Sequence, residues 1–321
     1  IYSRLIALKL DDIALFMNTP KTNNSDMVEN GWWDALPNNY IKWIRLGRFD
    51  RPVGFWLLLL PGWWVLPLTN LSLLECLKIM FIFLIGSIVM RAAGCTINDL
   101  WDKDIDKKIT RTKNRPLAKG DISVNQALIF LLIMSLIGLI CLYQLNTKTW
   151  FVAISAIPLI IIYPLAKRFT KWPQVVLGLT FSWAVPTAWA SASENWNLGI
   201  ILIYFATVFW IIGYDTIYGC QDKNEDEKFG VKNSAVSAKN FLSAFVSISY
   251  ILCFILLILG GYFLQANYFW FLGVMICGLH LLFQVIKLQD LNKNHPLKIF
   301  KSNVHLGLLL TIFSLSNHIS Y

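Results

Sequence analysis

Apolar residues fill long uninterrupted runs from residue 54 onward, and short polar connections separate one run from the next. A helix of about 20 apolar residues crosses the hydrocarbon core of a bilayer. The runs are apolar all round and show no amphipathic stripe, unlike the helices at the surface of a soluble domain. We therefore predict an all-α polytopic membrane protein with nine transmembrane helices, at residues 54–68, 77–97, 127–145, 150–165, 175–192, 198–214, 241–264, 268–286 and 304–319.

Proline interrupts some of these predicted helices, and the chain in front of them is polar. We expect kinks at the internal prolines, because neighbouring helices can satisfy the carbonyl groups that proline frees. These prolines are Pro61, Pro158, Pro164 and Pro186. Residues 1–39 are rich in Asn and polar, and we predict a mobile arm there. Residues 40–321 then form the membrane domain.

The composition agrees with this class, because 56% of the residues are hydrophobic and 15% are charged. A net charge of +9 would suggest nucleic-acid binding in a soluble chain. Here Lys and Arg fill every second connection, at residues 42–51, 103–119, 167–171, 223–239 and 287–301. Apart from Lys148, the alternate connections carry almost none. This alternation predicts that the N-terminus and the basic connections lie on the cytoplasmic or matrix side, and we expect no nucleic-acid partner.

Cysteine and histidine offer no metal or disulfide signal. The six cysteines are scattered without CxxC spacing and lie in or beside apolar runs, so we predict that they are small buried hydrophobes. The four histidines form no helical pair with metal-ligand spacing, which argues against zinc and haem. Asp11 and Asp12 argue against a mitochondrial transit peptide. We expect a bacterial inner membrane, with the mitochondrial inner membrane as the alternative.

The strongest chemical signal is a run of acids and bases at residues 91–116, where an apolar run ends. On a continuing helix, Asn98, Asp102 and Asp106 share one face, with Asp99 one position round. Carboxylates so close together repel one another unless a cation lies among them. Oxygen ligands without nearby Cys or His favour Mg²⁺, which commonly shares its coordination shell with substrate phosphates. The pattern therefore predicts a Mg²⁺-dependent diphosphate site.

A second acidic segment follows on the same predicted side of the membrane. Asp222 and Asp226 again stand four residues apart, and each comes 120 residues after Asp102 or Asp106. Asp215 precedes Asp222 by two helical turns. Two acidic clusters facing each other across a helical bundle would hold two Mg²⁺ ions on one diphosphate. We expect Asp102, Asp106, Asp222 and Asp226 to be the metal ligands and catalytic groups, with Asn98 and Asp99 in supporting positions.

Several cations accompany these acids. Arg91 lies inside an apolar run, where ionisable groups are usually functional or paired. Arg111, Lys113 and Arg115 are candidates for binding the diphosphate through charge-assisted hydrogen bonds. Acids and arginines in such a bundle are also typical of a transporter or proton relay. The depth of the acids distinguishes the two, since they gather at the ends of the predicted helices and not at mid-membrane.

At these residues the chain resembles the UbiA superfamily of membrane prenyltransferases. Its first motif, NDxxDxxxD, stands here as Asn98, Asp99, Asp102 and Asp106, and its second, DxxxD, as Asp222 and Asp226. The resemblance continues in MRAAGC, RTKNRPL, YPLAKR and PQVVLG, at residues 90–95, 111–117, 163–168 and 173–178. It implies nine helices around a central cavity that opens towards the lipid bilayer. One departure is the second motif, which has Asn224 and Glu225 where relatives often carry aspartates.

The YDTxY run before Asp222 is similar to the hydroxybenzoate branch of this family. That similarity implies transfer of a polyprenyl group from polyprenyl diphosphate to the ring carbon ortho to the hydroxyl of 4-hydroxybenzoate, in ubiquinone biosynthesis. It also implies that Arg168 binds the carboxylate of the aromatic acid, while Asp222 or Asp215 orients or deprotonates the phenol. Homogentisate, a naphthoate or haem remain alternative acceptors.

Overall fold

The computed structural model describes residues 31–288 and 296–318, and within them every regular element is a helix. The predicted all-α fold class is therefore confirmed. Most of the predicted mobile arm, residues 1–30, lies outside the described residues, as does Ile319 at the end of the last predicted helix. The chain divides into two compact units, Ile1–Pro52 with Val89–Ser135 and Val53–Ile88 with Leu136–Tyr321. Each unit is described by itself below.

The first unit places a short N-terminal helix against the end of a long one. Its elements are η1 (Trp32–Ala35), α2 (Asn38–Leu46), the last part of α4 (Leu73–Asp106), α5 (Pro116–Lys119) and the start of α6 (Val124–Tyr143). Leu46 of α2 packs in a small apolar core with Ala92 of α4 and Leu117 of α5. Trp43 also stacks on Phe130, with ring centroids 5.8 Å apart. These contacts fix the chain just before Arg48 against the elements that carry the first acidic motif.

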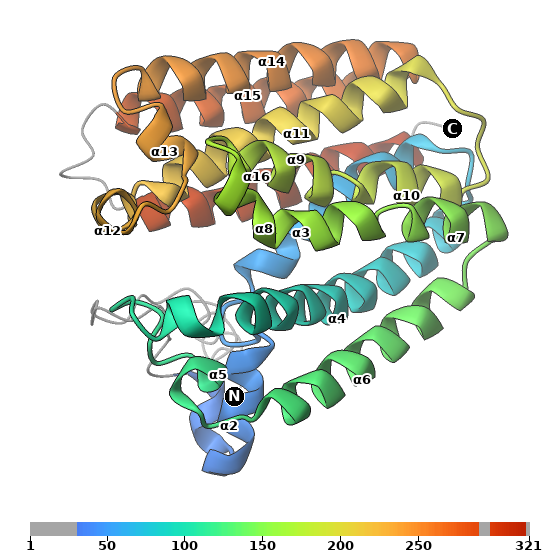
Figure 1. The fold of residues 1–321 in the computed structure, drawn as a ribbon. Helices are drawn as coiled ribbons and strands as arrows, with labels where there is room; N and C mark the ends of the chain where they lie inside the picture. Colours follow the sequence, from blue (N-terminus) through green and yellow to red (C-terminus); the bar gives the residue numbers. More distant parts are fainter. Residues whose placement is uncertain (1–30, 289–295, 319–321) are drawn as a thin grey trace, which may run out of the picture. The chain divides into compact units, whose positions relative to one another are not determined.

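The second unit is a helical bundle organised around α11 (Leu198–Gly219). Around it pack α3 (Val53–Val65), α9 (Pro173–Phe181), α10 (Ala184–Ser191), α14 (Leu242–Phe263) and α16 (Pro296–Leu315) (Figure 1). The unit also contains α4 as far as Ile88, the end of α6 from Leu136, η2 (Leu66–Leu68), α7 (Thr147–Ile154), α8 (Ile157–Phe169), α12 (Lys223–Phe229), α13 (Ser234–Ser237), α15 (Tyr268–Leu288) and η3 (Ser316–His318). In the most apolar 18-residue stretch of α11, 67% of the residues are buried. A buried central helix has a fixed position, which suits it to carry the second acidic segment at its end.

Helices α11 and α14 approach each other closely because glycines line their contact. A Cβ atom on Gly199 would lie 2.8 Å from the carbonyl oxygen of Gly260. A Cβ atom on Gly213 would lie 2.2 Å from Cε1 of Tyr250. Small residues of this kind let membrane helices approach until their backbones touch, which increases the van der Waals contact between them.

Seven helices are long and apolar enough to cross a membrane, within the described residues. These are Leu73–Asp106, Val124–Tyr143, Thr147–Phe169, Leu198–Gly219, Leu242–Phe263, Tyr268–Leu288 and Pro296–His318. A shorter apolar helix covers Val53–Leu68. The predicted helix at 175–192 is instead two short helices, α9 and α10, which meet at Ser182 and Trp183. The predicted count of nine is therefore not confirmed, although the polytopic membrane class is.

Two of the predicted proline kinks appear as breaks between short helices. The chain leaves the helix at Ser155 and Ala156 before Pro158, and at Ser182 and Trp183 before Pro186. Proline has no N–H to donate and its ring clashes with the preceding turn, so a helix ends more readily just before it. Pro61 and Pro164, by contrast, lie inside α3 and α8.

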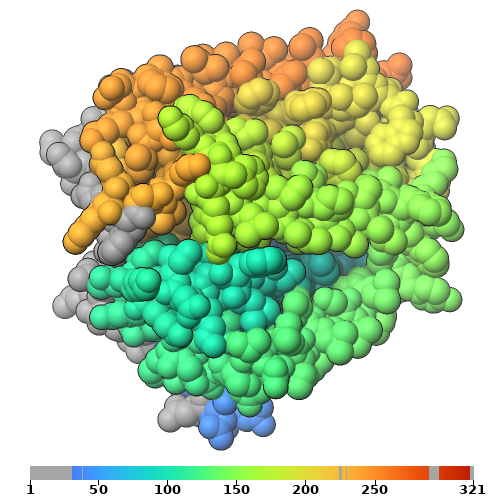
Figure 2. All heavy atoms as spheres, in the orientation of Figure 1, coloured from blue at the N-terminus to red at the C-terminus, as the bar shows by residue number. Residues whose placement is uncertain are grey.

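The side chains of α6 show which surface meets lipid. Only 17% of the residues in its most apolar 18-residue stretch are buried. Large apolar side chains such as Leu132, Leu139 and Ile140 are exposed along it, and this segment lies on the face shown in Figure 2. An exposed apolar surface of this length along one helix is costly in water but suits a hydrocarbon environment.

The prediction of buried cysteines is confirmed for five of the six. All six are free, and five of them are buried. The sixth, Cys220, follows α11, and burial raises the pKa of its thiol to about 11. A thiol with so high a pKa carries almost no thiolate at neutral pH, so it is a poor nucleophile and metal ligand.

Candidate active site

The first acidic motif lies on the last turns of α4, which stays helical as far as Asp106. Asp99, Asp102 and Asp106 are only 1%, 1% and 4% exposed. Their spacing of three and then four residues puts all three on one helix face. Asn98 is half-buried. Because α4 is helical as far as Asp106, Asn98, Asp102 and Asp106 do lie at i, i+4 and i+8 with Asp99 one position round, and of the two neighbours Asp99 is the buried one.

Arg115 bridges two of these carboxylates. Its Nη1 atom donates to Oδ2 of Asp106 at 2.9 Å and to Oδ1 of Asp99 at 3.3 Å. The chain reaches this position by turning back after α4, and the hydroxyl of Thr112 donates to the backbone oxygen of Asp106 at 3.1 Å. Pro116 then starts α5, since a proline is well suited to the first turn of a helix. The predicted partner of the diphosphate is thus also a counter-ion of the acids.

Arg48 is a second counter-ion, and the sequence analysis missed it. Its Nη2 atom donates to both carboxylate oxygens of Asp99, at 2.7 and 2.9 Å, and its Nη1 donates to the carbonyl oxygen of Arg45 at 2.7 Å. The side chain of Arg48 is 8% exposed. Its backbone has φ +58°, in the left-handed region that residues other than glycine rarely adopt. No sequence pattern announces such a residue, and Arg48 had counted only as one of the basic residues flanking the first predicted helix.

Two guanidinium groups neutralise part of the negative charge of this stripe, since Arg48 pairs with Asp99 and Arg115 pairs with both Asp99 and Asp106. Buried carboxylates are tolerated when they are paired and hydrogen-bonded. Asp99 accepts from both arginines, so its observed role is that of an internal counter-ion.

The other predicted cations of the first unit have different surroundings. Arg91 on α4 is half-buried. In the connection between α4 and α5, Arg111 is half-buried and Lys113 is exposed. Lys107 pairs with Asp104 at 3.0 Å on the exposed side of α4. An exposed ion pair of this kind contributes little to stability.

The second acidic motif does not continue the helix that precedes it. Helix α11 ends at Gly219, the chain turns, and Asp222 precedes the first residue of α12. The amide of Asp226 donates to the carbonyl oxygen of Asp222 at 2.8 Å. Asp226 on α12 therefore lies one turn after Asp222, the residue at the N-terminal cap of this helix, as their spacing predicted. Asp215 lies on α11, so the expectation that it is two turns before Asp222 on one helix is wrong.

Asp226 is held by an amide that the sequence analysis also missed. Nδ2 of Asn233 donates to Oδ2 of Asp226 at 2.8 Å and to the carbonyl oxygen of Gly219 at 3.1 Å. The orientation of this amide is fixed because its Oδ1 accepts from Nε2 of Gln174 and from the amide of Ala235. Gly230, with φ +70°, ends α12 and lets the chain return to α11. Asn233 thus joins the end of α11 to Asp226.

Arg168 lies beside this second segment. It is exposed in the last turn of α8, and its carbonyl oxygen accepts from Nζ of Lys232 at 3.0 Å. The hydroxyl of Ser237 donates to the carbonyl oxygen of Lys171 at 2.8 Å. Together with the contact between Gln174 and Asn233, these bonds join the connection that carries Arg168 to the loop that follows Asp226. The structure therefore brings two of the predicted site segments together within the second unit.

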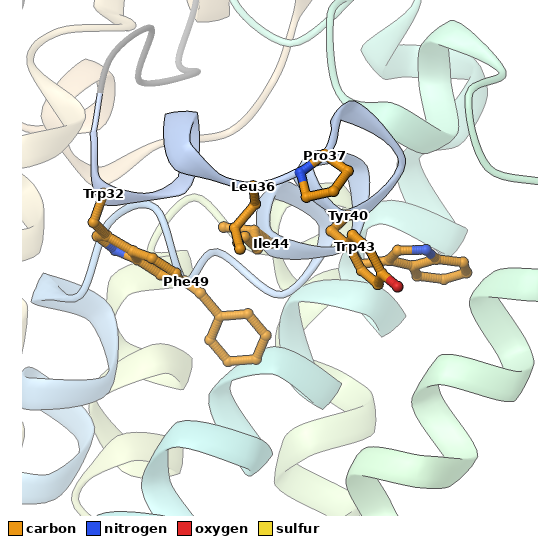
Figure 3. Close-up of a pocket in the computed structure, with 7 residues that line it drawn as sticks. All are labelled: Trp32, Leu36, Pro37, Tyr40, Trp43, Ile44 and Phe49. Atoms are coloured by element: carbon orange, nitrogen blue, oxygen red, sulfur yellow. The ribbon is translucent and has the colours of Figure 1, made fainter.

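A groove in the first unit is chemically different from either motif. Its walls are almost entirely apolar and it has a volume of about 360 Å³ (Figure 3). It is lined by Trp32, Leu36, Pro37, Tyr40, Trp43, Ile44 and Phe49. Such a surface offers no charge to a diphosphate or a carboxylate, so the acidic motifs remain the candidates for chemistry.

The donor set of the two motifs suits a hard divalent cation. Aspartate oxygens are the ligands that Mg²⁺ prefers, whereas a soft sulfur ligand such as Cys220, two residues before Asp222, suits it poorly. In the described part of the chain, no group of three or more His, Cys, Asp or Glu side chains forms a metal site by itself.

Comparisons with known protein families and with known sequences both identify prenyltransferases as relatives of this chain. The sequence model of the UbiA prenyltransferase family matches residues 58–309 of the chain. The chain is 39% identical over 272 residues to "4-hydroxybenzoate polyprenyltransferase, mitochondrial" of Drosophila pseudoobscura pseudoobscura, covering 83% of this chain and 68% of that relative. It is 36% identical over 278 residues to 4-hydroxybenzoate octaprenyltransferase of Coxiella burnetii (strain CbuK_Q154), covering 84% and 96%.

Among solved structures, the fold resembles a UbiA homolog from Archaeoglobus fulgidus bound to GPP and Mg²⁺. The TM-score is 0.64 with 20% sequence identity, and the match covers 87% of this chain and 99% of that one. A likeness at this identity concerns the fold alone.

Proposed function

The chain belongs to the UbiA prenyltransferase family, and on this premise we propose that it transfers a polyprenyl group from polyprenyl diphosphate to 4-hydroxybenzoate. The acceptor atom is the ring carbon ortho to the hydroxyl, the other product is diphosphate, and the pathway is ubiquinone biosynthesis. The observation that carries this assignment is the identity of 36–39% to relatives named for 4-hydroxybenzoate. The buried carboxylate stripe on α4 supports it, because a diphosphate enzyme needs such groups to hold its metal.

We propose Mg²⁺ as the metal, with Asp102, Asp106, Asp222 and Asp226 as its protein ligands. When bound, Mg²⁺ neutralises the negative charge that develops on the leaving diphosphate. The protein contributes fixed carboxylates: Arg115 contacts Asp106, and Asn233 holds Asp226. Orienting partners of this kind raise the metal affinity of a site because the ligands need not be ordered on binding.

The other site residues act on the two substrates. Arg111, Lys113 and Arg115 donate hydrogen bonds to the diphosphate as its bond to the allylic carbon breaks. The ring carbon of the acceptor forms the new carbon–carbon bond and then loses its proton, which restores the aromatic ring. Asp222 or Asp215 orients the phenol or takes its proton. Arg168 binds the carboxylate of the acid, a role for which a planar guanidinium is suited.

The polyprenyl chain requires a membrane, and the exposed apolar helices provide the surface that meets it. By the distribution of Lys and Arg, we propose that the acidic motifs face the cytoplasm or the mitochondrial matrix. Relatives are found both in a bacterium and in a mitochondrion, so either inner membrane fits.

The test is prenyl transfer in membranes from cells that express the chain. Labelled 4-hydroxybenzoate and a long polyprenyl diphosphate are supplied with Mg²⁺, with EDTA, or with EDTA followed by excess Mg²⁺. We expect a labelled lipid with Mg²⁺, its loss with EDTA and its return on readdition. Membranes from cells with the empty vector show how much product the host itself forms.

Acceptor identity is tested in the same membranes. Homogentisate, a naphthoate and haem replace 4-hydroxybenzoate at equal concentration, and each product is separated by chromatography. Product from 4-hydroxybenzoate alone supports the assignment. If folded protein prenylates another acceptor and leaves 4-hydroxybenzoate unchanged, the proposed acceptor is wrong although the reaction class stands.

A further inference from the structure

We propose that Arg48 is a positioning residue of the first acidic motif: it holds Asp99 in place as a counter-ion, and through Asp99 and Arg115 it fixes the carboxylate of Asp106. The consequence for catalysis rests on the proposed function, because it assumes that Asp106 binds a metal. The geometry itself lies entirely within the first unit.

The pair of Arg48 and Asp99 is built as a buried, two-point contact. One nitrogen of Arg48 donates to both oxygens of Asp99, at 2.7 and 2.9 Å, and the two side chains are 8% and 1% exposed. Exposed ion pairs are weak, but removal of one partner from a buried pair leaves an uncompensated charge. Asp99 is therefore the group whose position depends most on Arg48.

Arg48 is itself anchored from the other side. Its second nitrogen donates to the carbonyl oxygen of Arg45 in the last turn of α2. Leu46, in the same segment, is buried in the core that contains Ala92 of α4. The guanidinium thus connects a packed helix end with the acidic face of α4. A left-handed conformation at a residue other than glycine is strained, and such strain persists where surrounding contacts fix it.

A chain of contacts leads from Arg48 to the proposed metal ligand. Oδ1 of Asp99 accepts from Arg48 and also from Nη1 of Arg115, and the same Nη1 donates to Oδ2 of Asp106. Arg115 therefore divides its charge between two acids. If Arg48 no longer neutralised Asp99, Arg115 would be drawn towards Asp99, and Asp106 would lose part of its orienting contact.

The first experiment compares Arg48→Lys with the matched control Arg45→Lys. Lysine keeps the positive charge, but its one nitrogen cannot reproduce the fixed fork by which Nη2 of Arg48 donates to Asp99 while Nη1 donates to the carbonyl oxygen of Arg45. Arg45 lies three residues away, is half-buried, and its side chain forms no ion pair within the described part of the chain. Mg²⁺ and inorganic diphosphate are titrated together into purified protein by calorimetry, and the melting temperature of each variant is measured.

We expect Arg48→Lys to weaken Mg²⁺ binding by about 10-fold or more, as loss of an orienting contact typically does. Arg45→Lys should bind Mg²⁺ as the wild type does. In the transfer assay, the Mg²⁺ concentration for half-maximal rate should rise for Arg48→Lys while the KM for 4-hydroxybenzoate stays unchanged. A well-folded Arg48→Lys protein with wild-type Mg²⁺ affinity would overturn the proposal.

A second set of variants tests whether Arg48 acts through Asp99. If so, the double variant Arg48→Lys, Asp99→Asn should bind Mg²⁺ no more weakly than Asp99→Asn alone, whereas additive losses would refute the connection. Asp99→Asn also carries the test if Arg48→Lys fails to accumulate, because it removes the same ion pair with little change of shape. Wild-type protein that binds Mg²⁺ but prenylates none of the acceptors would count against the proposed function and leave this inference standing.

Discussion

Gly213→Ala should destabilise the second unit, although alanine normally favours a helix. Gly213 lies in α11, where the ring of Tyr250 from α14 packs directly against it. A Cβ atom there would lie 2.2, 2.6 and 2.9 Å from three ring carbons of Tyr250, whereas ordinary contacts begin near 3.4 Å. The ring therefore has to withdraw by about 1 Å, or the two helices have to separate.

Withdrawal of the ring is opposed from its far end. Tyr250 is buried, and its hydroxyl donates to Oε1 of Gln284 at 2.6 Å. Overpacking a core typically costs about 1–3 kcal/mol, and loss of a buried hydrogen bond costs about 1–3 kcal/mol more. The higher helix propensity of alanine returns about 1 kcal/mol. We therefore expect a net loss of about 1–5 kcal/mol, which corresponds to a melting temperature lower by about 2–20 °C.

Thermal unfolding of the purified protein in detergent, followed by tryptophan fluorescence, measures this change. Gly86→Ala is the matched control, since Gly86 also lies within a long apolar helix but a Cβ on it meets nothing within 4 Å. That variant should be as stable as the wild type or slightly more stable. If Gly213→Ala melts together with Gly86→Ala, the contact between α11 and α14 is looser than these distances imply, and the reasoning fails.

Three further predictions concern the proposed chemistry. Asp102→Asn and Asp226→Asn should each abolish prenyl transfer while the melting temperature stays within a few degrees of wild type; a near-normal rate in either variant would remove that residue from the metal site. Removal of Mg²⁺ by EDTA should stop turnover reversibly, and turnover at the wild-type rate in EDTA would refute metal dependence. Arg168→Ala should raise the KM for 4-hydroxybenzoate far more than the KM for polyprenyl diphosphate. Equal effects on both KM values would show that Arg168 does not bind the carboxylate of the acceptor.

The helices were predictable from sequence because the bilayer imposes a simple requirement. Every backbone group in hydrocarbon must be satisfied within the chain, so a long apolar run becomes a helix. The predicted run at 198–214 is the core of α11, and that at 241–264 is α14. Helix breaks were harder to place. The run at 175–192 is apolar throughout, yet it divides into α9 and α10 before Pro186, and proline alone did not distinguish this break from the unbroken helix around Pro164.

Spacing placed the acids on helices but did not decide which of them are buried. Asn98 and Asp99 are neighbours, and either fits a face with Asp102 and Asp106 within the tolerance of helical periodicity. The structure shows that the buried one is Asp99, which accepts from Arg48, a residue from another part of the chain. Likewise, the spacing of Asp215 and Asp222 suggested one helix. In the structure, α11 ends at Gly219, whose carbonyl oxygen accepts from Nδ2 of Asn233, and the chain turns there.

Both acidic motifs therefore depend on residues that sequence spacing does not connect to them. Arg48 reaches the first motif from 51 residues away, and Asn233 contacts Asp226 only after the chain turns at Gly230. A carboxylate at a helix end has several rotamers, and a contact that selects one of them reduces the entropy lost when a cation binds. Substitutions at Arg48 or Asn233 should thus change metal affinity while every acidic residue is intact. Variation at these two positions could tune the metal requirement of the enzyme without altering its motifs.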